Sequence, residues 1–216
     1  GLDALNKPNQ NNIIQNQPQE VIDQLVALYN QGQITTVIKQ AEILTEQYPN
    51  SPVIWNILGA SRAQIGMLNE AIEAYKECIL LKPDFADAYN NIGVAFRNQG
   101  KLDEAIEAYK KAISVKPDYA GAYSNMGVAL KDQEKFDEAI EAYKKAILLK
   151  PDYAEAYDNM GVALKNKGKL DEAIEAYEKA VSLKPLHVKA YYNMGNALKD
   201  QGKLEEAIKC FNKALA

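Results

Sequence analysis

The sequence has little of what catalysis or metal binding requires. Its 216 residues include one histidine, two cysteines and one tryptophan, and their spacing matches neither a nucleophile-histidine-acid triad nor a zinc cluster. The histidine, His187, and the cysteines, Cys78 and Cys210, are far apart in the sequence, and we expect them to pack in or beside the core. We therefore expect no catalytic residue, no metal site, no cofactor and no enzymatic activity in this chain.

Long apolar runs and an excess of positive charge are also absent. Hydrophobic residues make up 47% of the chain and charged residues 25%, with a formal net charge of -4. No apolar run is long enough to cross a membrane, and a negative chain lacks the basic surface typical of general nucleic-acid binding. We expect partners other than membranes and nucleic acids and, since no targeting segment is visible, a cytoplasmic location.

What the sequence does have is a period of 34 residues. Closely similar segments begin at Ala88, Ala122 and Ala156 and align without a gap. A fixed period in this range indicates one supersecondary unit stacked on copies of itself, because each unit cannot bury its hydrophobic face alone. Function should therefore be sought in a repeated surface rather than in a single pocket.

Small and bulky residues recur within each unit at helical spacing. Gly93 and Ala105 fall where two helices must cross closely, whereas Ile92 and Tyr109 belong to buried helical stripes. Gly100 follows the first helix, as a C-terminal glycine often does. Each unit is therefore predicted to be a pair of helices joined by a short turn.

Two charge patterns of the second helix follow the same period. Asp103 and Glu104 fall in its first turn, where the helix dipole favours anions, so we interpret such acidic pairs as structural rather than catalytic. Glu107 and Lys111 are predicted to form an exposed i, i+4 ion pair.

These residues resemble the pattern of the tetratricopeptide repeat, in which aromatic, glycine, alanine and proline residues occupy fixed positions of a 34-residue unit. Counting Ala86 as position 1, the matching residues are Tyr89, Gly93, Phe96, Ala105, Tyr109, Ala112 and Pro117. The resemblance implies an all-α fold, a right-handed α-solenoid of antiparallel helix pairs. It divides the chain into a disordered or loosely docked segment at 1–17, a degenerate repeat at 18–51, repeats at 52–85, 86–119, 120–153 and 154–187, and a truncated repeat at 188–216.

One repeated residue is not required by packing within its own repeat. Position 6 is occupied in four consecutive repeats by Asn91, Asn125, Asn159 and Asn193. At about 100° per residue it lies about 200° around the helix from the buried aromatic at position 4. In the tetratricopeptide family this face lines a concave groove, and the row is similar to the asparagine ladder of O-linked N-acetylglucosamine transferase superhelices, which holds a peptide by its backbone. The resemblance implies that these amides bind a partner polypeptide.

Neighbouring positions favour this hypothesis over its alternative, the recent duplication of an unused asparagine. Position 5 has diverged to Asn90, Ser124, Asp158 and Tyr192, while position 6 is constant. We also expect an apolar floor to the groove at position 9, formed by Val94, Val128 and Val162 and ending at Asn196.

A second ligand mode of the family, a two-carboxylate clamp for chaperone C-terminal tails, does not fit the residues. It requires a lysine at position 5 and a cation at position 6 two repeats later, whereas position 5 carries no lysine and the last repeat has Asn193. Chaperone-tail binding is therefore set aside.

The sequence leaves two functions open. The first is a protein-interaction scaffold that binds a partner polypeptide in its concave groove. The second is the substrate-recognition arm of a larger transferase, such as a glycosyltransferase or sulfotransferase, whose catalytic domain lies beyond residue 216.

The last helix carries a separate expectation. Ile208, Phe211 and Leu215 recur on one helical stripe, and the equivalent residues of earlier repeats are expected to pack against the following repeat. An uncovered apolar stripe is a candidate association site, so we expect self-association through the C-terminal end.

Overall fold

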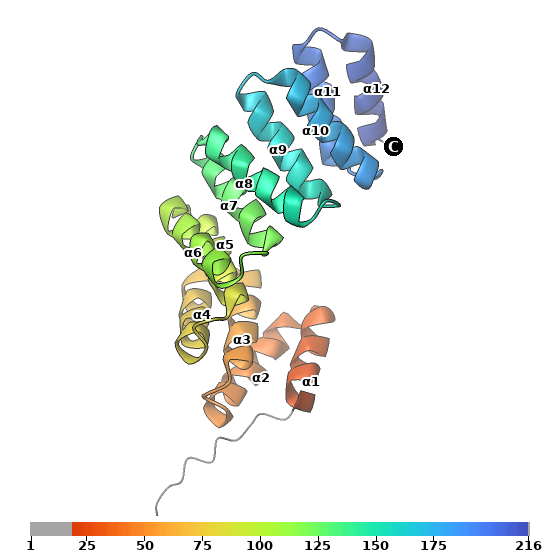
Figure 1. Cartoon of the computed structure of the whole chain (residues 1–216). Coiled ribbons are helices and arrows are strands. Elements are labelled where there is room, and N and C mark those ends of the chain that lie inside the picture. The colour runs from red at the N-terminus through yellow and green to blue at the C-terminus, as the bar shows by residue number, and fades with distance from the viewer. Residues whose placement is uncertain (1–18, 216) are drawn as a thin grey trace, which may run out of the picture. The chain divides into compact units, whose positions relative to one another are not determined.

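The computed structural model describes residues 19–215, which form helices and connecting turns and contain no strand. The chain divides into two compact units, Gly1–Lys82 and Pro83–Ala216 (Figure 1). The segment 1–17, for which we expect a disordered or loosely docked state, lies outside the described residues.

The first unit contains two helix pairs around its own core. Its helices are α1 (Gln19–Asn30), α2 (Ile34–Gln47), α3 (Pro52–Gln64) and α4 (Leu68–Leu81). The core includes Leu25, Ile54 and Leu58, which are almost completely buried. Ser51 caps α3 by accepting a hydrogen bond from the backbone N–H of Ile54 at 3.3 Å, an arrangement typical of helix N-termini.

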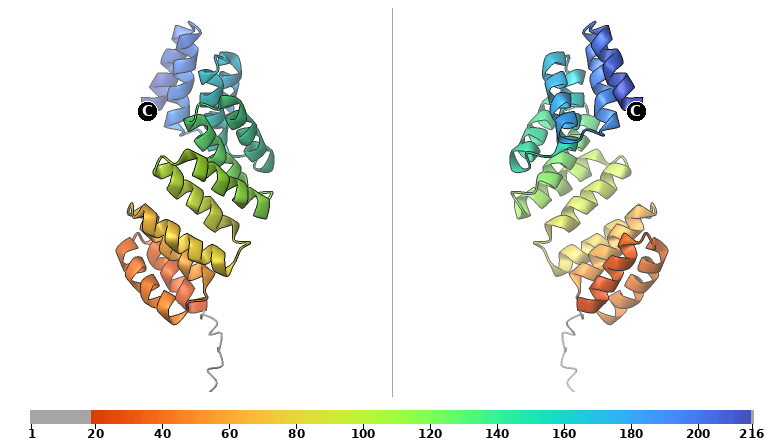
Figure 2. Two further views of the ribbon diagram at one scale, coloured as in Figure 1. Left: turned by 90° about the vertical axis from the view of Figure 1, so that its left-hand side faces the viewer. Right: turned by 90° about the vertical axis from the view of Figure 1, so that its right-hand side faces the viewer.

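The second unit contains four helix pairs. Its helices are α5 (Ala86–Asn98), α6 (Leu102–Val115), α7 (Ala120–Asp132), α8 (Phe136–Leu149), α9 (Ala154–Asn166), α10 (Leu170–Leu183), α11 (Val188–Asp200) and α12 (Leu204–Leu215). They follow one another in chain order through the stack (Figure 2). We call α5, α7, α9 and α11 the first helices and α6, α8, α10 and α12 the second helices. The predicted all-α solenoid of helix pairs is confirmed for the described residues.

The two kinds of helix are packed differently. Each first helix contacts the next first helix along the stack, whereas no such contact joins successive second helices among the described residues of this unit. The second helices are therefore splayed apart. The side on which the first helices meet is called the inner face below.

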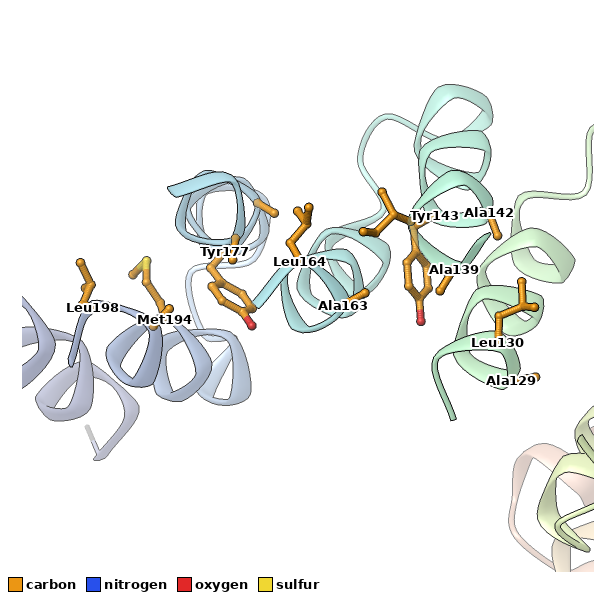
Figure 3. Packing of buried hydrophobic residues seen from close by; sticks show 14 of the residues in the cluster. Ala129, Leu130, Ala139, Ala142, Tyr143, Ala163, Leu164, Tyr177, Met194 and Leu198 are labelled. Atoms are coloured by element: carbon orange, nitrogen blue, oxygen red, sulfur yellow. The ribbon is translucent and has the colours of Figure 1, made fainter. Parts of the chain in front are cut away.

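Glycine allows the close crossing inside each pair. A Cβ atom built on Gly93 would lie 2.5 Å from the ring of Tyr109, and one built on Gly127 would lie 2.7 Å from the ring of Tyr143. Such distances are far below van der Waals contact, so only glycine fits there. Figure 3 shows the rings of Tyr143 and Tyr177 inside the resulting core, near Ala139, Ala163 and Leu164.

The turns between paired helices need a left-handed residue. Gly100 has φ 76° and Gly168 has φ 75°, but the corresponding residue in the repeat between them is Glu134, with φ 61°. A side chain in this region costs about 1 kcal/mol, so this turn is less favourable than its neighbours.

The prediction that Glu107 forms an ion pair with Lys111 is wrong, because Glu107 pairs with a different lysine. The carboxylate of Glu107 accepts from the ammonium of Lys110 at 2.8 Å, and Glu141 pairs in the same way with Lys144. Both are i, i+3 pairs with exposed side chains, so each contributes little to stability.

Candidate inner-face site

The four asparagines at position 6 lie one on each first helix. Asn91, Asn125, Asn159 and Asn193 belong to α5, α7, α9 and α11, and all four are half-buried. Two of them bond to a preceding first helix, which places the row on the inner face.

These hydrogen bonds join adjacent repeats. Asn125 donates through Nδ2 to Oδ1 of Asn90 at 2.9 Å. Two repeats later, Asn193 donates through Nδ2 to Oδ1 of Asp158, also at 2.9 Å. Asn125 and Asn193 therefore each have a structural partner in the preceding repeat, which a pattern based on packing within one repeat does not predict.

The partners belong to position 5, which the sequence pattern presented only as a divergent groove position. Asn90, Ser124 and Asp158 are all buried, and Asp158 is 2% exposed. The serine is too short to copy the other two, and in the part of the chain that the structure describes Asn159 makes no hydrogen bond of this kind. Burial of three polar residues in register was the missing signal, and it is not visible in a single sequence.

The Asp158 carboxylate fixes the orientation of the Asn193 side-chain amide. A carboxylate only accepts hydrogen bonds, so the amide must present its nitrogen to it. The second Asp158 oxygen faces the ammonium of Lys189 at 3.4 Å. The Asn193 carbonyl oxygen and its second N–H take no part in this hydrogen bond, so one acceptor and one donor of the amide remain for another group.

The valines that were expected to form an apolar floor are partly buried in the core. Val94, Val128 and Val162 are half-buried and pack against the main cluster of this unit. Asn196, at the end of this row, is half-buried as well. These side chains therefore retain some surface, but less than an open floor would have.

The second helices carry buried tyrosines whose rings pack against glycines of the first helices. Tyr109, Tyr143 and Tyr177 are completely buried, and their hydroxyl groups have no hydrogen-bond partner among the described residues. Burial raises the pKa of Tyr109 to about 12 and raises the pKa values of the other two hydroxyls further. In Figure 3 the hydroxyls of Tyr143 and Tyr177 point to the same side of the core.

No candidate metal site is assembled in the described part of the chain. No group of three or more histidine, cysteine and carboxylate side chains in residues 19–215 could hold a metal ion. Cys78 and Cys210 are both buried and form no disulfide, as predicted. Among the same residues, no helix combines the length and apolar character that crossing a bilayer requires.

The C-terminal stripe is exposed in two of its three positions. Ile208 is 58% exposed and Leu215 is 87% exposed, whereas the equivalent Ile106 and Ile140 are each 6% exposed. Phe211 is half-buried, because its ring packs on Gly195 and lies 5.8 Å from the ring of Tyr192.

Comparisons with known proteins agree with the repeat pattern. A family model described as TPR repeat matches residues 59–100, 93–133, 129–168 and 163–202, and one described as tetratricopeptide repeat matches residues 189–216. A comparison with curated proteins finds no match.

Solved structures with the same architecture are numerous. A crystal structure of MamA is 35% identical, with a TM-score of 0.67, over 73% of this chain and 92% of that one. A thermophilic TPR protein of Thermus thermophilus is 24% identical, with a TM-score of 0.68, over 84% of this chain and 98% of that one. YrrB, described as a TPR protein with an unusual peptide-binding site, is 22% identical, with a TM-score of 0.64, over 81% and 90% of the two chains.

Proposed function

Because this chain belongs to the tetratricopeptide repeat family, we propose that it is a protein-interaction scaffold, without catalysis of its own, that binds an extended segment of a partner polypeptide on the inner face of its second unit. The amides of Asn91, Asn125, Asn159 and Asn193 contact the backbone of that segment. The half-buried valines at position 9, with Asn196 at the end of their row, contact its side chains.

The observation that carries this proposal is the difference between Asn159 and its neighbours. The amides of Asn125 and Asn193 have partners at position 5 of the preceding repeat, which gives them a structural role. Asn159 follows Ser124 and has no such partner in the described residues, yet the amide is present there too. A purely structural role accounts for Asn125 and Asn193 but leaves Asn159 unexplained, whereas backbone recognition accounts for all three.

An asparagine amide suits backbone recognition because it offers a donor and an acceptor side by side. A peptide residue presents the complementary pair, its C=O and its N–H. The description of YrrB as having a peptide-binding site shows that a related fold can bind peptides and supports this class of ligand here.

The spacing of the helices limits how such a peptide is read. Packed helices lie roughly 8 to 10 Å apart, and an extended chain advances about 3.3 Å per residue. Successive asparagines should therefore contact about every third residue of the peptide. Recognition through these contacts depends little on the peptide sequence.

A peptide selected from a random displayed library against this chain tests the proposal. Its affinity for the wild type and for Asn125→Ala/Asn159→Ala is measured by isothermal titration calorimetry. We expect the double substitution to weaken binding by about 1 to 3 kcal/mol, taking about 0.5 to 1.5 kcal/mol for each hydrogen bond.

The matched control is Asn50→Ala/Asn212→Ala, which removes two exposed amides outside the row and should leave affinity unchanged. Circular dichroism confirms that both variants are folded. Unchanged affinity in the Asn125→Ala/Asn159→Ala protein would refute the role of the row.

We also propose that the chain self-associates through α12. The contrast between the exposed Ile208 and the buried Ile106 and Ile140 supports this proposal, since the equivalent side chain in the middle repeats is covered by a neighbouring repeat. Leu204 and Leu215 extend the exposed apolar surface of α12, and a patch of this kind favours association.

A further inference from the structure

Two cavities open between the splayed second helices, away from the asparagine row. One, of about 550 Å³, is lined by α6, α7 and α8, and the other, of about 560 Å³, by α8, α9 and α10. Volumes of this size are typical of ligand sites. The first helix contributes its positions 4, 7 and 11, which lie about 160°, 100° and 140° around the helix from position 6.

The cavities are two copies of one site. Nine lining residues of the first recur in the second 34 residues later: Ile106 and Ile140, Lys110 and Lys144, Tyr123 and Tyr157, Met126 and Met160, Leu130 and Leu164, Glu138 and Glu172, Glu141 and Glu175, Ala142 and Ala176, Lys145 and Lys179. The cavities arise from the packing of the helices: where successive second helices do not meet, the tyrosine and methionine side chains of the first helix between them are only half-buried.

The floor of each cavity is apolar and its rim is charged. Tyrosine, methionine and leucine side chains of the first helix form the floor, and the second helices supply most of the rim. Together the two linings carry eight carboxylates and five lysines, a formal charge of -3. Lys110 and Lys144 pair with Glu107 and Glu141 on their own helices. The rim carboxylates of Glu138, Glu175 and Glu178 form no ion pair among the described residues, so they favour an incoming cation.

In the last repeat, the tyrosine equivalent to those of the cavity floors contacts a lysine. There the ammonium of Lys213 lies 5.3 Å from the centroid of the Tyr191 ring, within the range of a cation-π interaction. Tyr191 is equivalent to Tyr123 and Tyr157. Within residues 19–215, no cation is placed over the rings of Tyr123 or Tyr157, and these two rings line the cavities.

We propose that the two cavities bind an amphipathic helix of a partner protein that carries lysine or arginine beside its apolar face. Apolar residues of that helix fill the floor, while its cations contact the rim carboxylates and the tyrosine rings. A helix is favoured over an extended segment because the walls are helices, whose backbone groups are already paired and cannot form a ladder with a strand.

The methionines provide a direct readout. The chain has four methionines; Met126 and Met160 line the cavities, whereas Met67 lies in the first unit and is exposed. The probe is a designed amphipathic helix of about 14 residues made of leucine and lysine. A second probe has the same leucines with glutamate in place of lysine.

Titration of the Leu/Lys helix into protein carrying ¹³C-labelled methionine methyls should shift the Met126 and Met160 signals to saturation and leave Met67 unchanged. The Leu/Glu helix should bind at least about tenfold more weakly, since its charges repel the rim. Equal binding of the two probes, or the absence of shifts at Met126 and Met160, would overturn the proposal.

Two pairs of substitutions separate this site from general attraction to a negative protein. Glu138→Lys/Glu172→Lys changes both rims and should weaken binding of the Leu/Lys helix by about tenfold. The control, Glu104→Lys/Asp152→Lys, makes the same charge change at exposed positions outside the linings and should weaken it by less than about threefold. Equal weakening by both pairs would contradict the proposal.

This site is independent of the asparagine row. The Asn125→Ala/Asn159→Ala protein should therefore bind the Leu/Lys helix with wild-type affinity and the same Met126 and Met160 shifts. Loss of those shifts in this variant would show that the two surfaces are not separate and would contradict the assignment.

Discussion

Asn193 donates its side-chain amide to Asp158 across the boundary between two repeats, with Nδ2 2.9 Å from Oδ1. The carboxylate is 2% exposed, and a buried charge depends strongly on each of its hydrogen-bond donors. The asparagine row is therefore part of the structure as well as part of the candidate binding surface.

This relationship predicts unequal effects of the same substitution in two repeats. Asn193→Ala deprives a buried carboxylate of a donor and should lower the free energy of unfolding by about 1 to 3 kcal/mol. Asn159→Ala removes an amide that has no hydrogen bond within the described chain and should change it by less than about 0.5 kcal/mol. Urea unfolding measures both, and equal losses would contradict the structural role of Asp158.

The close contact between Gly127 and Tyr143 predicts a steric penalty. A Cβ atom at position 127 would lie 2.7 Å from the ring, and overpacking of this kind costs about 1 to 3 kcal/mol, so Gly127→Ala should lower the midpoint of thermal unfolding. The control in the same helix is Gly121→Ala, whose Cβ meets only the Tyr119 ring at 3.2 Å. It should be close to neutral, because alanine also favours the helix.

The unpaired tyrosine hydroxyls predict a dependence on alkaline pH. Burial raises the pKa of Tyr109 to about 12, whereas in the unfolded chain the hydroxyl ionises near 10. Between these values the folded state binds more protons than the unfolded state, so the free energy of unfolding falls as pH rises above about 10.

Replacing Tyr109, Tyr143 and Tyr177 by phenylalanine should reduce this fall. The free energy of unfolding at neutral pH should remain within about 1 kcal/mol of the wild type or rise, because no hydrogen bond is lost inside the described chain. A phenylalanine fits such a site, since Phe211 packs on Gly195 in the same way as these tyrosines pack on their glycines. An unchanged alkaline midpoint in the triple variant would show that these hydroxyls do not limit stability at high pH.

The sequence predicts the helices well because the period places small and bulky residues in register. Gly93 was expected at the close crossing of two helices and Tyr109 in a buried stripe, and the Tyr109 ring does lie against that glycine. The acidic first turns and the Gly100 turn follow from equally local rules. These features depend on residues of one repeat and can be deduced without knowing how repeats stack.

Contacts between repeats were harder to anticipate. The angle of position 6 within its own helix says nothing of the preceding helix, so the bonds from Asn125 to Asn90 and from Asn193 to Asp158 were missed. The cavities near Met126 and Met160 were missed for the same reason, since they arise from the splay of the second helices rather than from any motif.

The exposed stripe of α12 predicts a concentration-dependent assembly. Ile208→Glu should shift the chain toward monomer, because it places a charge at the centre of the proposed contact. Leu148→Glu is the matched control, since Leu148 is also exposed but lies on α8. Phe211 is a poorer test site, because it is half-buried and its substitution would disturb the fold. Light scattering across a concentration series that shows a monomeric wild type, or equal effects of both substitutions, would contradict association through α12.

Recognition of a peptide backbone by the asparagine row is tested most directly by changing the backbone alone. Each amide nitrogen of a peptide that binds the chain is methylated in turn, and its affinity is measured by isothermal titration calorimetry. We expect losses of about 0.5 to 1.5 kcal/mol at about every third residue, in step with the asparagines, and no such loss at those residues in the Asn125→Ala/Asn159→Ala protein. Losses without this period, or losses that persist in the double variant, would contradict backbone recognition by the row.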